Sequence, residues 1–263
     1  MTTDTLQVTP ELLSLINSDT VFQPRIPASI KETGLNAIYI EGLLLKHLAA
    51  TATVCDQYPT LYDKPHRTVA YLPLCHILGR DIAVTLPLFT QLVPHFGEDV
   101  EDLPATLFEV APTVLFTVPR YLQKLAAQVL VGIQGTSAVK RASYDLAMRF
   151  ARAHAQRRWD GNVTATQEAM YAALRAAVFT PILNKLGCDR LELAISGGAP
   201  LSPETGAFWQ MLGVNVCEMY GQTECAGGIV SGQKGPFPRP GDVGEPVQGW
   251  DVGLGEGGEV IVR

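Results

Sequence analysis

The sequence predicts an α/β fold in which mostly parallel strands are flanked by helices. Two observations carry this prediction: four short apolar runs, and helical segments that alternate with them. The runs are nearly continuous in apolar character, which is typical of strands buried on both faces of a parallel sheet. The alternation of strands with helices indicates right-handed crossover connections.

The four expected strands are Thr68–Leu74, Thr113–Val118, Leu191–Ile195 and Val214–Met219. The helices expected between them span residues 77–94, 119–131 and 202–212. Ser202 begins the last helix, because it precedes Pro203 and Glu204 as an N-cap precedes a proline and an acid in the first turn. The segment "GEGGE" at 255–259 lies between apolar runs and predicts a hairpin turn. We therefore expect a short β-rich stretch at the C-terminal end.

Composition and charge exclude several classes of protein. A chain of 263 residues buries a substantial core, and its net charge of −6 argues against general nucleic-acid binding. We expect neither a secretory signal nor a membrane-spanning helix, because no basic segment precedes an apolar block and no apolar run is long enough. The five cysteines are scattered without CxxC spacing, as in a reduced cytoplasmic protein without a zinc site.

Residues suited to ligand binding follow each expected strand. His76 follows the first strand, Arg120 the second, the segment "SGGAP" at 196–200 the third, and "MYGQTE" at 219–224 the fourth. The carboxyl ends of parallel strands meet at one edge of a sheet, where ligands bind in α/β proteins. We therefore expect a site along that edge.

The segment "SGGAP" predicts a close approach of the backbone to a flat ligand. Gly197 and Gly198 have no Cβ and can adopt positive φ, and Pro200 stiffens the exit of the turn. The alternative is an ordinary strand-to-helix turn, since glycine pairs are common there.

The segment "MYGQTE" combines groups that a nucleotide needs. Tyr220 offers a ring face for stacking, Gly221 permits a tight turn, and the Thr223 hydroxyl can donate to a phosphate oxygen. Glu224 is a hard carboxylate ligand, and Mg²⁺ takes one or two such groups beside phosphates. These residues predict a magnesium-nucleotide site, whereas the alternative is a polar loop with a solvated glutamate.

Five segments together resemble the adenylate-forming (AMP-binding) acyl-CoA synthetase family. They are "YLPLCHI" (71–77), "PTVLFTVPR" (112–120), "SGGAPL" (196–201), "YGQTE" (220–224) and "PGDVGEPVQGWDV" (240–252) with the closing "GGEVIVR" (257–263). The resemblance covers roughly residues 45–263. The helical insertion at about 137–187 is most similar to the long-chain fatty acid subgroup.

The resemblance implies a two-step reaction with ATP, Mg²⁺, a fatty acid and coenzyme A. The fatty carboxylate attacks the α-phosphorus of ATP, releasing pyrophosphate, and coenzyme A then displaces AMP from the acyl-adenylate. By resemblance, Tyr220 stacks on adenine, Thr223 binds phosphate, Glu224 holds Mg²⁺, and His76 lies near the reacting carboxylate. The implied nucleotide-binding set is Gly197, Gly198, Ala199, Pro200, Met219, Tyr220, Gly221, Gln222 and Thr223.

The sequence departs from the family pattern before residue 45. A Ser/Thr/Gly-rich phosphate loop ending in lysine is expected there, but the surroundings of Lys31 and Gly34 do not form such a backbone nest. The family's ribose-binding aspartate, its hinge and its C-terminal domain with a catalytic lysine would follow Arg263. We expect the chain as printed to keep an adenine and magnesium half-site with little or no ligase turnover.

The expected organisation has three parts. Residues 1–44 are a poorly matched segment, residues 45–239 a partial AMP-binding domain, and residues 240–263 the start of a β-rich subdomain. The acid substrate stays open, and Gly79, Arg80 and Gln222 are candidate walls of the acyl pocket. Two other functions stay open too: a ligase for another carboxylic acid, or a non-catalytic nucleotide- and acyl-binding module.

The segment Val139–Arg158 has two interpretations. Apolar residues at 142, 146 and 150 form a helical i, i+4 line between basic residues. Such a helix can contact an anionic membrane surface, or it can be a solvated face over the acyl tunnel.

Overall fold

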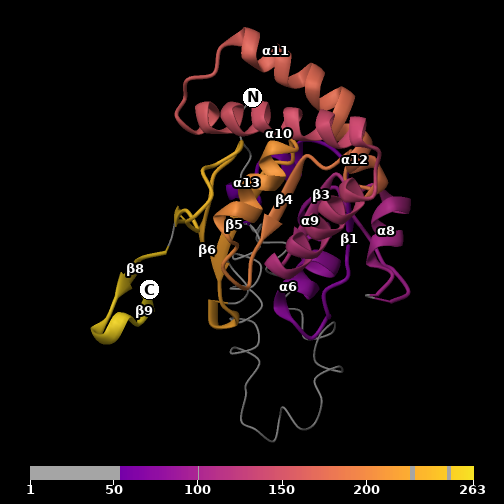
Figure 1. The fold of residues 1–263 in the computed structure, drawn as a ribbon. Coiled ribbons are helices and arrows are strands. Elements are labelled where there is room, and N and C mark those ends of the chain that lie inside the picture. Colours follow the sequence, from indigo (N-terminus) through magenta and orange to yellow (C-terminus); the bar gives the residue numbers. More distant parts are fainter. Residues whose placement is uncertain (1–53, 100, 226–228, 248–249) are drawn as a thin grey trace, which may run out of the picture. The chain divides into compact units, whose positions relative to one another are not determined.

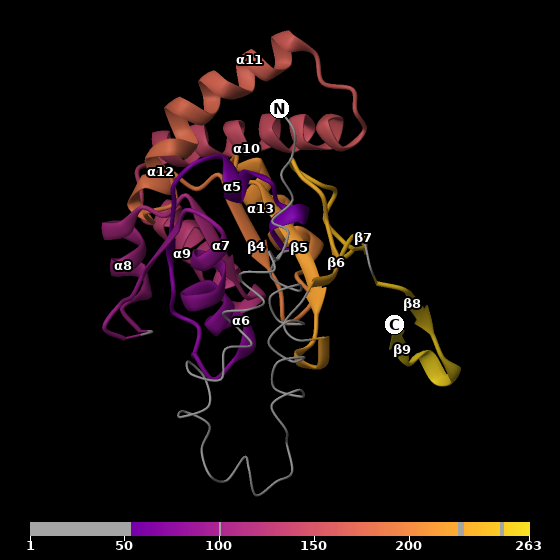
Figure 2. The same ribbon diagram turned by 180° about the vertical axis from the view of Figure 1, so that it is seen from behind.

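A computed structural model describes residues 54–99, 101–225, 229–247 and 250–263 (Figures 1 and 2). The chain divides into two compact units, residues 1–48 and 49–263, and every described residue lies in the second. The expected departure around Lys31 and the segment 1–44 therefore lie outside the described residues, and the boundary expected at 239/240 stays a prediction. None of the helices in the described ranges combines the length and apolar character of a membrane span.

The central sheet has the order β3-β4-β5-β6-β7. Three strands are parallel: β3 (Val114–Thr117), β4 (Leu193–Ser196) and β5 (Val216–Gly221). The strands β6 (Ile229–Gly232) and β7 (Glu245–Pro246) continue the sheet in antiparallel pairing. The predicted α/β class and three of the four predicted strands are confirmed, with bounds shifted by one or two residues.

The first predicted strand is shorter than expected, and a strand beside it was missed. β1 (His66–Val69) ends before Leu74, and Pro73 lies beyond it in a turn, where its carbonyl accepts from His76 N at 2.9 Å. β1 pairs in parallel with β2 (Leu92–His95). Pro94 argues against a strand in the sequence, but proline is tolerated on a strand that pairs on one side.

The helix predicted over 77–94 is confirmed from Ile77 to Phe89 and is wrong over its last five residues, 90–94. The segment consists of α6 (Ile77–Arg80), a π-helical turn (Asp81–Thr85), α7 (Leu86–Phe89) and then β2. The other two predicted helices are confirmed as α9 (Pro119–Gln134) and α13 (Pro203–Met211). Ser202 caps α13 as expected, since its Oγ accepts from Thr205 N at 3.2 Å.

The predicted insertion is helical. It contains α10 (Ala138–Trp159), α11 (Ala165–Leu174), a π-helical turn (Arg175–Phe179) and α12 (Thr180–Lys185). The remaining elements are α5 (Thr60–Asp63), α8 (Leu103–Val110), and the hairpin β8 (Val252–Leu254) and β9 (Val260–Val262). A 3-10 turn at Glu256–Gly258 joins the hairpin strands, as "GEGGE" predicts. Figures 1 and 2 show α10 and α11 at the end of the sheet opposite the loop that follows β5.

The two faces of the sheet contribute to two apolar clusters. Leu115 packs with residues of α9, α10, α12 and α13, such as Trp209. Its neighbours Val114 and Phe116 pack with residues of α5, α7 and β6, such as Leu61. Successive side chains of a strand point to opposite faces, so a strand with both faces covered must be continuously apolar.

The packed face of α10 differs from the apolar line expected at 142, 146 and 150. Tyr144, Ala147, Ala151 and His154 are buried, whereas Leu146 is 69% exposed. The small alanines let the helix approach its neighbours closely, so the buried stripe is set by size and not by the largest apolar residues.

Buried His154 joins α10 to α11. Its Nε2 lies 3.0 Å from Glu168 Oε2, and its ring stacks on Tyr171 with centroids 4.2 Å apart. Burial first, and then the positive charge of Arg158, hold the pKa of His154 below its ordinary value of 6.5.

We predict that the His154 imidazole makes the fold sensitive to acid. The unfolded chain takes up this proton more readily, so the free energy of unfolding falls as the pH drops through about 6.5. A His154→Phe variant keeps an aromatic ring for stacking but cannot titrate. Urea unfolding at pH 7.5 and 5.5 should show a smaller acid loss in the variant. An equal loss in both proteins would assign the acid sensitivity to other groups.

Candidate functional site

The carboxyl ends of β3, β4 and β5 are in register. Thr117 pairs with Ser196, and Ser196 pairs with Glu218. Gly197 N also donates to Thr117 O at 3.1 Å, so the loop after β4 starts against the end of β3. The segments that follow these three strands therefore lie along one edge. The sequence predicted this for the residues that follow all four expected strands, and the register confirms it for three of them.

The loop 197–200 is held at both ends and exposed between them. Gly197 is buried, and a Cβ there would lie 3.2 Å from the Met219 side chain. Gly198 has φ +81°, a conformation that favours glycine. Leu201 N closes the loop by donating to Glu218 Oε2 at 2.9 Å. Ala199 and Pro200 are exposed, so the middle of the loop is open to a ligand.

Glu218 is the residue of this edge that sequence reasoning missed. Its side chain is only 5% exposed, and its Oε1 has no hydrogen-bond partner among the described residues. Ser196, which pairs with Glu218 in the β4–β5 register, also has a buried Oγ without a hydrogen-bond partner among the described residues. Burial raises the pKa of the Glu218 carboxyl, and the backbone N–H of Leu201 opposes that rise. A single charged residue inside the apolar run Val214–Met219 was the available signal.

Gln233 supports Glu218 from the loop after β6. Its Oε1 accepts from Glu218 N at 2.9 Å, and its Nε2 donates to Arg239 O at 2.9 Å. Gln233 is itself buried, and hydrogen bonds are stronger away from water. The backbone of β5 at Glu218 is therefore held by the Gln233 side chain in addition to the backbone hydrogen bonds of the sheet.

The segment 219–224 changes from strand to turn at the edge. Met219 packs against an apolar cluster and Tyr220 is partly buried opposite Ser231 of β6. The β5–β6 register is irregular between Tyr220 and Gly221, and a 3-10 turn covers Thr223–Cys225. This turn leaves the Thr223 and Glu224 side chains exposed.

The donor chemistry of this turn fits Mg²⁺ held beside phosphates. Within the described ranges, no group of three or more His, Cys, Asp or Glu side chains could hold a metal ion. The turn itself offers one exposed carboxylate, from Glu224, and one exposed hydroxyl, from Thr223. Mg²⁺ commonly binds proteins through one or two carboxylates and completes its shell with phosphate and water.

Figures 1 and 2 both show α6, whose N-cap is His76, at the same end of the sheet as the turn after β5. The His76 side chain is exposed, and its Nδ1 accepts from Leu78 N at 3.2 Å as the N-cap of α6. Gly79 is buried, and a Cβ there would lie 2.3 Å from Pro73 O. Gly79 thus supports the turn under His76, while Arg80 is exposed.

Residues 42–262 match the profile of a family described as "AMP-binding enzyme". The long-chain-fatty-acid–CoA ligase FadD15 of Mycobacterium bovis is 29% identical over 208 residues, which are 78% of this chain and 34% of that protein. The long-chain-fatty-acid–CoA ligase ACSBG2 of Homo sapiens is 26% identical over 205 residues, 77% of this chain and 29% of that protein. The chain thus spans about a third of the length of the curated relatives it matches.

A solved structure shares the fold. MenE of E. coli with bound OSB-AMS, an enzyme variant, superimposes with a TM-score of 0.50 at 19% identity. The match covers 83% of this chain and 34% of that one. It confirms the α/β architecture.

We predict opposite results for two replacements of Glu218. Glu218→Gln keeps an oxygen for Leu201 N without a buried charge, whereas Glu218→Ala leaves that N–H unpaired and should cost about 1–3 kcal/mol. With the pKa raised above its ordinary 4.5, the carboxyl stabilises the fold below that pH and loses this contribution as pH rises. Urea unfolding at pH 5 and 8 should therefore show a smaller loss at pH 8 in Glu218→Gln than in the wild type. If Glu218→Gln is as unstable as Glu218→Ala, the ionised carboxylate is required.

Proposed function

The chain belongs to the AMP-binding enzyme family, and on that premise we propose that its strand-end loops bind the adenine and phosphates of ATP for activation of a carboxylic acid. The observation that carries the proposal is the register of Thr117, Ser196 and Glu218, which aligns the ends of β3, β4 and β5. It supports one shared site for the loops at 197–200 and 219–224.

Adenine binding is proposed between the loop 197–200 and the Tyr220 ring. An adenine ring is flat, so it needs a backbone that it can approach and an aromatic face on which it can stack. Gly198 in its positive-φ conformation and the exposed Ala199–Pro200 backbone supply the first. Tyr220 supplies the second, with Met219, Gly221 and Gln222 shaping the strand end beneath it.

Phosphate binding is proposed at the 3-10 turn. The Thr223 hydroxyl would donate to a phosphate oxygen, and the Glu224 carboxylate would hold Mg²⁺. The ion would neutralise charge on the phosphates. The Thr223 and Glu224 side chains are both exposed in this turn, so a ligand can reach them.

In the proposed reaction, a carboxylate oxygen bonds to the α-phosphorus of ATP, and the bond to the bridging oxygen breaks as pyrophosphate leaves. The thiol of coenzyme A then bonds to the acyl carbon, loses its proton, and AMP leaves with the electron pair. The residues of this chain would position the reactants and offset developing charge. His76 is proposed to lie beside the reacting carboxylate, its Nδ1 already used to cap α6.

A long-chain fatty acid is the proposed substrate class. The support is the likeness to two long-chain-fatty-acid–CoA ligases over more than three quarters of this chain. The helical insertion at about 137–187, which contains α10, α11 and α12, supports the same subgroup. In this proposal residues 45–239 form the AMP-binding part and residues 240–263 begin a β-rich subdomain.

We predict that ATP binding depends on Mg²⁺ through Glu224. Calorimetric titration of the chain with ATP should show an affinity that rises with Mg²⁺, and Glu224→Gln should reduce it about tenfold or more, or 1.4 kcal/mol. Glu256→Gln is the matched control, because it neutralises an exposed carboxylate in the β8–β9 turn. Equal binding with and without Mg²⁺, or equal loss in both variants, would contradict the proposal.

The stacking role of Tyr220 has its own prediction. Tyr220→Phe keeps the ring and should bind ATP as the wild type does. Tyr220→Ala should lose about 1–3 kcal/mol, the range measured for a base stacked on an aromatic side chain. The same titration measures both. Loss of binding in Tyr220→Phe would show that the hydroxyl, and not the ring face, makes the contact.

The acid class is tested separately by binding, because little turnover is expected of this chain. Two non-hydrolysable acyl-adenylate analogues are titrated, one with a long alkyl group and one with an aromatic group, and the alkyl analogue should bind more tightly. Tighter binding of the aromatic analogue would contradict the fatty acid proposal and leave the nucleotide proposal unaffected.

A further inference from the structure

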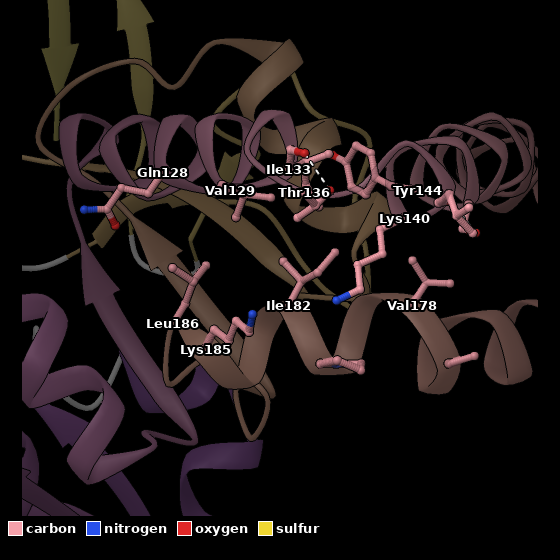
Figure 3. A pocket seen from close by; sticks show the side chains of 15 residues that line it. Gln128, Val129, Ile133, Thr136, Lys140, Tyr144, Val178, Ile182, Lys185 and Leu186 are labelled. Atoms are coloured by element: carbon pink, nitrogen blue, oxygen red, sulfur yellow. Dashed lines mark hydrogen bonds between the residues drawn. The ribbon is translucent and has the colours of Figure 1, made fainter.

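A groove lies between α9, α10 and the segment that leads into α12. Figure 3 shows its lining side chains, and its volume is about 400 Å³. Its apolar walls come from Val129 and Ile133 of α9, Val178 of the π-helical turn, and Ile182 and Leu186. A volume of this size is within the range of small-molecule sites.

The groove carries positive charge and no negative charge. Lys140 and Lys185 line it, and no Asp or Glu is among the lining residues. Figure 3 shows the two ammonium groups on either side of Ile182. Within the described ranges, neither lysine has a carboxylate within 4.0 Å. An anion in the groove would therefore meet two exposed ammonium groups that form no ion pair with the described carboxylates.

A buried hydroxyl in the same groove has no partner. Tyr144 lines the groove and is only 6% exposed, and its hydroxyl makes no hydrogen bond among the described residues. A buried polar group without a partner destabilises the fold. The hydroxyls of Thr136 and Ser143, which also line the groove, donate to Ile133 O and Val139 O. Tyr144 is thus the hydroxyl that a ligand would satisfy.

The groove is separate from the candidate nucleotide site. α9 begins at Pro119, beside the carboxyl end of β3, and Val129 lies ten residues further along the helix. At 1.5 Å per residue this is about 15 Å from the strand ends. The groove lies against the later part of α9, where the helix approaches α10.

We infer that this groove binds a single-chain amphiphilic carboxylate such as a fatty acid, with its chain along the apolar walls and its carboxylate beside Lys140 and Lys185. A neutral apolar ligand would leave both ammonium groups without a counter-charge near an apolar surface. A second alkyl chain would need a larger volume than one chain does. This inference stands independently of the proposed nucleotide site, because it uses none of the residues at the strand ends.

The probe is dodecanoate, used below its micelle concentration, with dodecanol as the neutral ligand of equal chain length. Calorimetric titration of the chain in the absence of ATP should show saturable binding of dodecanoate. Dodecanol should bind about tenfold more weakly or worse, since it lacks the charge that the lysines attract.

Gly132 permits a variant that fills the groove without disturbing the fold. It lines the groove, and a Cβ added there meets no atom within 4 Å. Gly132→Leu should place a side chain in the groove and abolish dodecanoate binding. Gly132→Ala is the matched control, because it gives α9 the same gain in helix propensity with only one methyl group. It should bind within about twofold of the wild type.

Charge is tested on the lysines. Lys140→Met and Lys185→Met keep the aliphatic stem and should each weaken dodecanoate binding about two- to fivefold, as expected for exposed charge pairs. Lys124→Met removes an exposed charge of α9 that does not line the groove and should change nothing.

Tyr144→Phe distinguishes a ligand contact from a structural role. Removing an unpaired buried hydroxyl should leave thermal stability without ligand unchanged or higher, and should weaken dodecanoate binding about fivefold. A less stable variant with unchanged binding would overturn the assignment of Tyr144.

The groove assignment as a whole is overturned by any of three results. They are no saturable binding to the wild type, equal binding to Gly132→Leu, which would place the ligand elsewhere, and binding that the lysine variants do not change. None of these results depends on ATP, so this inference and the proposed nucleotide site fail separately.

Discussion

The common register of β3, β4 and β5 is the constraint on which the candidate site depends. Backbone ladders place Thr117, Ser196 and Glu218 side by side, and each strand ends within a few residues of that line. Loops that are far apart in the sequence therefore emerge at one edge. A shift of one residue in any of these pairings would exchange the two faces of a strand, each of which packs in a different apolar cluster. Burial of both faces thus fixes the register, and the register places the loops at one edge.

Glu218 connects this register to the loop that would contact a ligand. Its backbone N–H is held by Gln233, and its side chain holds the backbone of Leu201 at the end of the loop 197–200. A carboxyl in this position is expensive to bury, because one of its oxygens has no partner among the described residues. Local strain or unpaired groups of this kind are typical of functional sites, where geometry is maintained at some cost in stability.

The sheet separates two kinds of surface. Short polar loops with glycine and hydroxyl groups follow the carboxyl ends of the strands, and the candidate nucleotide residues lie there. The groove between α9, α10 and α12 is apolar with two lysines, and it belongs to the helical layer. α9 links them, since its first residues adjoin the end of β3 and its later residues form a wall of the groove.

Sequence by itself predicted the α/β class, three strands of the central sheet, helices at 119–131 and 202–212, and the candidate loops, because these depend on local periodicity, capping and turn chemistry. It predicted a strand over Thr68–Leu74, but β1 ends at Val69 and Pro73 lies in a turn. It also predicted a helix over 77–94, but the segment is helical only to Phe89, and Pro94 lies in β2, which pairs with β1. Only the tertiary structure decided which face of α10 is buried, since alanines at 147 and 151 pack closely while Leu146 does not. It also decided the partners of Glu218 and the groove beside Tyr144, because contacts between distant segments depend on packing that no local pattern encodes.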